Sequence, residues 1–153
     1  MYRYIDSKPF INRTILADIN RLKKSDATAL NSAEDIKKFI NNLFESKFLL
    51  AMLSRGSDDS SESFSPYLIQ SDMGYILPIF TNKFDILKES DMFDDYTIYV
   101  DNFSNIILIY KTLLNTLGQL YISIDPFGTN YILDKGMIDN AITIAANNLN
   151  ELN

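Results

Sequence analysis

The side chains that could carry chemistry in this chain are carboxylates. Its 153 residues include twenty Asp and Glu, but no histidine and no cysteine. Their absence excludes Ser-His-Asp and Cys-His catalysis, disulfides and cysteine-type zinc sites. Paired carboxylates can still do acid–base work, and Asp85, Asp101 and Asp125 each stand at the boundary of a predicted helix or strand. Aspartate also caps helices and turns at such boundaries, and the sequence leaves open whether any two of the three meet.

The run Asp125-Pro126-Phe127-Gly128 is the first candidate among these positions. It is suited to a β-turn, because Asp can bond its own backbone and Gly can adopt a positive φ. An aspartate at the end of a strand can also serve a binding or catalytic site. Asp125 and Pro126 therefore form a candidate functional turn, and a plain structural turn is the interpretation that we favour.

Three more carboxylates lie close together at Asp91, Asp94 and Asp95. A Ca²⁺ site needs six to eight oxygen ligands and usually a glycine in its loop, which this segment lacks. The five glycines of the chain are too dispersed for a nucleotide-binding loop. We therefore predict no catalytic residue, no metal and no cofactor, and a protein that is not an enzyme.

Charge is unevenly distributed along the chain, whose net charge is −6. Residues 1–30 carry six basic and three acidic groups, whereas the other 123 residues carry eight basic and seventeen acidic groups. An acidic body repels phosphate, so we expect neither nucleic acid nor an anionic membrane as a partner. The basic N-terminal arm could dock on the body or meet an acidic partner, and a solvated helix face is the interpretation that we favour. With no export signal visible, we expect a cytoplasmic protein.

The elements that must position these residues follow from apolar periodicity and from turn signals. Strand Lys47–Leu53 is expected to be buried on both faces, and the polar run from Ser54 to Ser65 to be a mobile loop. The other predicted strands are Pro66–Gln70, Tyr75–Phe80, Tyr96–Val100, Leu120–Ile124 and Tyr131–Leu133. The predicted helices run from Ser7 to about Lys24, from Ser32 through Phe44, over Phe84–Leu87, from Phe103 to Leu117 and from about Gly136 to Leu149. This order predicts a single α+β domain, in which helices pack on a mixed or antiparallel sheet of about five to six short strands.

One stretch resembles a known family. A glycine-led strand, Gly74-Tyr-Ile-Leu-Pro-Ile-Phe-Thr81, precedes a short helix and resembles the SseB N-terminal domain family of bacterial "enhanced serine sensitivity" proteins. The run from Tyr121 to Gly128 and the predicted helix and strand over 35–53 resemble other parts of that domain, although Asp125 stands where the family more often has Asn. The resemblance implies an α+β bacterial domain over 31–153, preceded by a helical extension at 1–30, and brings no catalytic residues with it.

The leading functional prediction is a protein-interaction module. Pro78 cannot donate to a sheet ladder, so its strand is expected at a sheet edge, where a partner could add, or Pro78 at a bulge. The apolar face of the first helix is expected to pack on a partner or to form a homodimer. The candidate interaction residues are Tyr2, Arg3, Tyr4, Ile15, Ile19 and Pro78. The alternatives are an acidic immunity- or chaperone-like protein that masks a basic effector, and a small-ligand or carboxylate-based enzymatic domain.

Overall fold

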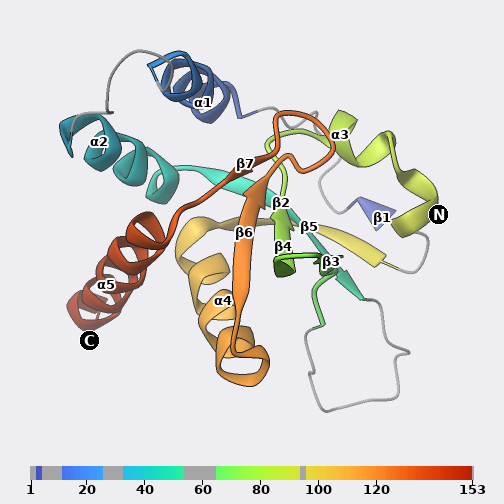
Figure 1. The fold of residues 1–153 in the computed structure, drawn as a ribbon. Helices are drawn as coiled ribbons and strands as arrows, with labels where there is room; N and C mark the ends of the chain where they lie inside the picture. Colours follow the sequence, from blue (N-terminus) through green and yellow to red (C-terminus); the bar gives the residue numbers. More distant parts are fainter. Residues whose placement is uncertain (1–2, 5–11, 26–32, 54–64, 94–95, 153) are drawn as a thin grey trace.

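A computed structural model describes residues 3–4, 12–25, 33–53, 65–93 and 96–152. The helices are α1 (Arg13–Ser25), α2 (Ala33–Phe44), α3 (Lys83–Leu87), the 3-10 helix η1 (Ser90–Phe93), α4 (Phe103–Leu117) and α5 (Lys135–Leu152). The strands are β1 (Arg3–Tyr4), β2 (Lys47–Leu53), β3 (Ile69–Ser71), β4 (Gly74–Ile79), β5 (Tyr96–Asn102), β6 (Leu120–Ile124) and β7 (Tyr131–Ile132). Figure 1 shows these elements packed as one α+β unit, which confirms the predicted fold class.

The strands form two sheets that meet edge to edge. One has the order β1-β5-β2 and the other the order β3-β4-β6-β7. Backbone bonds between Leu49 and Phe80, 2.8 and 3.0 Å long, join β2 to the end of β4. The pairs β1–β5 and β4–β6 are parallel and the other pairs are antiparallel. The sheet is therefore mixed, as predicted, but it has seven strands in two parts, because β1 was not foreseen.

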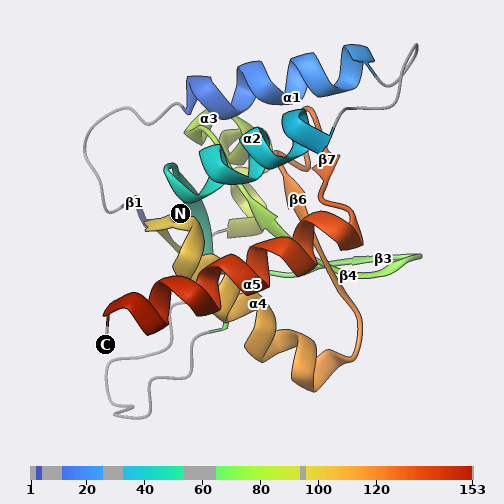
Figure 2. The same ribbon diagram turned by 90° about the vertical axis from the view of Figure 1, so that its left-hand side faces the viewer.

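Both faces of β2 are buried, as its continuous apolar sequence predicts. Phe48, Leu50 and Met52 belong to the larger core cluster, whereas Leu49 and Ala51 belong to the smaller one. Successive side chains of a strand point to opposite faces, so the two clusters lie on opposite sides of the sheet. The helices α1, α2, α4 and α5 contribute to the larger cluster, and Figure 2 views the molecule from their side. The helices α3 and η1 cover the other face.

The helix α1 begins at Arg13, inside the range predicted for the first helix. The Asn12 side chain accepts a bond from the Ile15 amide at 3.2 Å and so caps α1. Ile15 and Ile19 are fully buried in the larger core cluster. Both were predicted to face a partner or a second copy, and that prediction is wrong because α2 and the core already cover them. A helix of the predicted extension thus contributes to the core of the domain.

Pro78 does not mark a sheet edge. It is buried in β4, which lies between β3 and β6. The Asp125 amide donates to the Ile79 oxygen on the β6 side, and the peptide groups of neighbouring strand residues face opposite sides. The Pro78 nitrogen therefore faces the side where β3 has already ended, its last partner on β4 being Ile76. A missing backbone donor costs nothing on that side, so an interior strand tolerates this proline. Because Pro78 is buried, its prediction as an interaction residue is wrong.

Other local predictions are confirmed. Asn102 caps α4 by accepting from the Asn105 amide, and Gly118 ends that helix at φ 79°. Residues 69–71 and 74–79 form the expected hairpin. The mobile-loop prediction falls mostly outside the described residues, as do Ser7, Ser32 and Tyr2. Arg3 and Tyr4 pair as β1 with Thr97 and Ile98, so part of the N-terminal arm does dock on the body.

Candidate functional site

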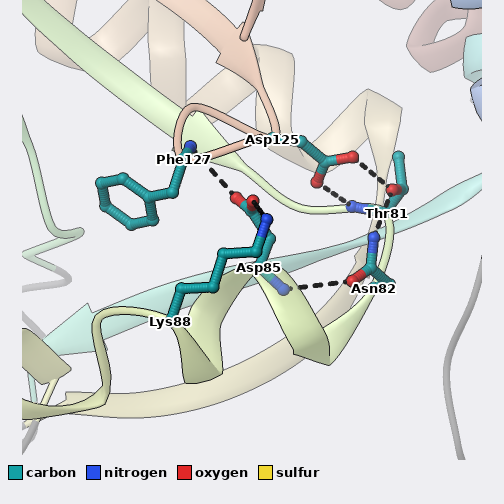
Figure 3. Close-up of polar contacts among 6 residues, drawn as sticks. All are labelled: Thr81, Asn82, Asp85, Lys88, Asp125 and Phe127. Atoms are coloured by element: carbon teal, nitrogen blue, oxygen red, sulfur yellow. Dashed lines mark hydrogen bonds and ion pairs between the residues drawn. The ribbon is translucent and has the colours of Figure 1, made fainter. Parts of the chain in front are cut away.

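Two buried aspartates meet at the end of β6, and they form the cluster drawn in Figure 3. Asp125 directly follows β6, and Asp85 lies on α3, which directly follows the end of β4. Both strand ends lie side by side because β4 and β6 are parallel neighbours. The sequence named both residues as boundary acids, and the parallel pairing is what brings them together.

Asp125 is held by Thr81, which follows β4. The Thr81 amide donates to Asp125 Oδ1 at 2.9 Å, and its hydroxyl donates to Oδ2 at 2.5 Å. The Asp125 carbonyl accepts from the amides of Gly128 and Asn130, which closes the turn. Asp125 has a φ of 53°, a left-handed conformation that Asp and Asn adopt more readily than most residues. The hydrogen bonds of the Asp125 side chain and those of its backbone therefore restrain the same turn.

Asp85 is bound from two directions. Its Oδ2 accepts from the Phe127 amide at 3.2 Å, and its Oδ1 lies 3.8 Å from Lys88 Nζ. Its own amide donates to the side chain of Asn82, the N-cap of α3. A Cβ built on Gly128 would lie 2.8 Å from Asp85 Oδ1, so only glycine fits there without a shift. The cluster thus ties α3 to the turn that follows β6.

Both carboxyl groups are almost completely buried, with 3% of Asp85 and 2% of Asp125 exposed. Burial is the largest cause that raises the pKa of Asp125; the hydrogen bonds from Thr81 lower it, and the Asp85 charge raises it further. Burial also raises the pKa of Asp85, against the lowering effects of the Phe127 amide and of Lys88. Each proton is therefore held more tightly than on an exposed aspartate.

This carboxylate cluster has the acids for proton transfer, but its two carboxyl groups are almost completely buried. The three cavities described here are lined by residues other than Asp85 and Asp125. Both oxygens of Asp125 are occupied by Thr81. The hydrogen bonds of Asp125 to Thr81 and of Asp85 to Phe127 connect the turn after β6 to the segment after β4, and we call this connection the latch. The half-buried Pro126 is part of that turn. The favoured structural interpretation of the Asp125-Pro126 turn thus accounts for every contact seen there.

A different feature is open to solvent, and we call it the β5–α4 groove. It has a volume of about 460 Å³. Leu50 and Met52 line it from β2, Tyr99 and Asp101 from β5, and Leu108 and Ile109 from α4. Tyr99 and Leu108 are 41% and 37% exposed, which is high for such large apolar side chains. Of the predicted interaction residues that the structure describes, none lines this groove.

The sequence did contain weak signals for the groove. Leu108 falls outside the apolar face of α4, whose buried members are Phe103, Ile106, Ile107 and Tyr110. Tyr99 occupies an alternating position in a strand of strong β-propensity. Neither signal identifies a site by itself, because single exposed apolar residues are common on protein surfaces.

Comparisons with known proteins add no function. No protein-family model matches the chain, and no curated protein and no solved structure matches it either. The resemblance to the SseB N-terminal domain family therefore stays a prediction. Within the described part of the chain, no three acidic side chains are grouped so that they could hold a metal ion. Among the same residues, no helix is long and apolar enough to cross a membrane.

Proposed function

We propose that this chain is a protein-interaction module that binds an extended segment of another protein along β5. The observation that carries the proposal is the incomplete pairing of that strand. On one side β2 pairs with β5 from Tyr96 to Asn102. On the other side β1, the part of the N-terminal arm that the structure describes, covers Thr97 and Ile98. Among the described residues, nothing pairs with Tyr99–Asp101 on that side.

An unpaired strand edge presents backbone donors and acceptors to a partner strand. Here the edge borders the β5–α4 groove, so a strand added beside Tyr99 places alternate side chains over Leu108 and Ile109. Backbone pairing would supply affinity, and the groove would supply specificity for apolar side chains. Of the other two cavities described, one lies between α2 and α5 and the other between α4, β6 and α5.

Charge suggests the chemistry of the partner. Asp101 lines the groove, and the chain as a whole has a net charge of −6. Opposite charge across an interface speeds association and favours specific partners. The expected occupant is therefore an extended segment that alternates apolar residues with lysine or arginine.

A library of random linear dodecapeptides provides the test. We expect selected peptides to alternate apolar and basic residues and to protect the amides of residues 99–101 from hydrogen exchange. Leu108→Lys should abolish binding, because it places a positive charge in the groove, at an exposed position, against the basic side chains of the segment. Phe84→Lys is the matched control, since Phe84 is 54% exposed on α3, away from the groove.

Two results would overturn this proposal. One is selected peptides that leave residues 99–101 unprotected and that bind Leu108→Lys as well as the parent. The other is a full chain that selects no peptide, while a chain without residues 1–11 selects peptides at the groove. That second result would mean that the groove belongs to the chain's own N-terminal arm.

A further inference from the structure

A second cavity lies on the helix side of the molecule, and we call it the α4–α5 cleft. It has a volume of about 530 Å³ and lies between the end of α4, strand β6 and the first half of α5. The two helices pack on each other, and Figure 2 shows them side by side. A cavity of this size suits a small organic molecule, since such ligand sites measure roughly 300–1,000 Å³.

The walls of the cleft are mostly apolar. Leu114 comes from α4, and Ile138 and Ile142 come from α5. Leu133 adds a buried side chain from the segment before α5. An apolar ligand body would therefore replace water against aliphatic side chains, which is favourable in proportion to the area buried.

The polar groups of the cleft are rich in acceptors. The Tyr110 hydroxyl donates its proton to the Leu120 carbonyl at 2.8 Å, so its remaining lone pairs accept. The Tyr121 hydroxyl takes a bond from Gln119 Nε2 at 2.7 Å. Asp139 lines the same cleft, and its carboxylate has no ion-pair or hydrogen-bond partner among the described residues.

The carboxylate of Asp139 acts on the interior of the cleft and not only on solvent. Burial is the main cause that raises the pKa of Tyr110, and the charge of Asp139 is the next, followed by Tyr121. Tyr110 is 5% exposed, so the field of Asp139 reaches a buried hydroxyl. Asp139 is itself exposed, so its carboxylate stands at the rim of the apolar cleft, where it can pair with a cationic donor whose apolar body lies inside.

We propose that the α4–α5 cleft binds an organic ammonium ion with an apolar body. Its ammonium group donates to Asp139 and to the Tyr110 oxygen, and its body lies between Leu114 and Ile142. Lys135 lines the same cleft, one helical turn before Asp139, and its like charge opposes the bound cation. The site is independent of the β5–α4 groove.

The test titrates the full chain with 2-phenylethylammonium and, separately, with 2-phenylethanol, which has the same apolar body without the charge. Binding is read from amide shifts in ¹⁵N–¹H spectra. We expect the ammonium ion to shift residues of the α4–α5 cleft and to bind about threefold to fivefold more tightly than the alcohol, because an ion pair with an exposed carboxylate is weak.

Three variants decide the roles of the charges. Asp139→Asn should reduce the affinity for the ammonium ion to that for the alcohol, and Lys135→Gln should raise it. Asp72→Asn, in the exposed turn between β3 and β4, is the control and should leave it unchanged. The proposal is overturned by equal binding of ammonium ion and alcohol, by an Asp139→Asn variant that binds like the parent, or by no cleft shifts at about 10 mM ligand.

Discussion

Replacing Asp125 by alanine tests whether the carboxylate cluster is a structural latch. The change removes both acceptors of Thr81, a residue with no exposed surface. A buried donor left without a partner costs about 1–3 kcal/mol. The Thr81 hydroxyl keeps one contact, because Asn82 Nδ2 still donates to it at 3.1 Å. The lost bonds alone therefore make Asp125→Ala clearly destabilising.

Backbone conformation adds to this cost. Asp125 has a φ of 53°, and an alanine in the left-handed region costs about 1–2 kcal/mol. Removing the carboxyl group also removes the cost of its desolvation in the folded state, which offsets part of this destabilisation. We expect Asp125→Ala to lower the free energy of unfolding by about 2–4 kcal/mol, a large part of the usual stability of a domain.

Two companion variants separate the contributions. Asp125→Asn keeps an oxygen for the Thr81 amide and tolerates the left-handed backbone, so we expect it within about 1 kcal/mol of the parent. Asp125→Gly loses the hydrogen bonds to Thr81 but adopts the left-handed backbone without strain. Its free energy of unfolding should therefore lie between those of Asp125→Asn and Asp125→Ala. Urea unfolding followed by circular dichroism measures all three. An Asp125→Ala variant as stable as the parent, or an Asp125→Asn variant as unstable as Asp125→Ala, would refute the latch.

Two other predictions concern the same cluster. The pKa values of Asp85 and Asp125 are higher in the folded chain than in the unfolded chain, so proton binding stabilises the folded state. This stabilisation is complete below the ordinary aspartate pKa of about 3.9. It is lost as the pH rises through the raised pKa values of the folded chain. Urea midpoints between pH 3 and 7 should therefore fall for the parent relative to Asp125→Asn as pH rises, and a constant difference would contradict the raised pKa values. Gly128→Ala should lower stability by about 1–3 kcal/mol, because its Cβ meets Asp85 Oδ1. In thermal denaturation, Asp85→Ala should make the same Gly128 substitution nearly neutral, and equal costs in both backgrounds would exclude the contact.

Local sequence determined most of the elements. The strand 47–53 has the predicted bounds, because a short continuous apolar run between polar residues is typical of a strand buried on both faces. The α4 helix begins after Asn102 and ends at Gly118, as the cap and the glycine indicate. These features depend on side chains that act within a few residues of their own backbone, so they are visible in the sequence.

Predictions from the sequence were wrong where the role of a residue depended on segments distant in the chain. Pro78 indicated a sheet edge, but it lies where a short neighbouring strand has ended, which depends on the length of β3. The apolar face of α1 indicated a partner, but α2 covers it. Asp18 of α1 accepts from Asn42 of α2 at 2.7 Å, a contact between segments that no spacing predicts.

The candidate sites show the same division. The sequence alone supplied the carboxylates, the turn at Asp125 and the absence of histidine and cysteine, because residue types need no fold. The parallel pairing of β4 with β6 decided that Asp85 and Asp125 meet, and burial decided that they form a latch. The groove beside Tyr99 and the cleft beside Asp139 exist only because helices pack on particular strands. A surface is made by residues distant in sequence, and only the tertiary structure brings them to one place.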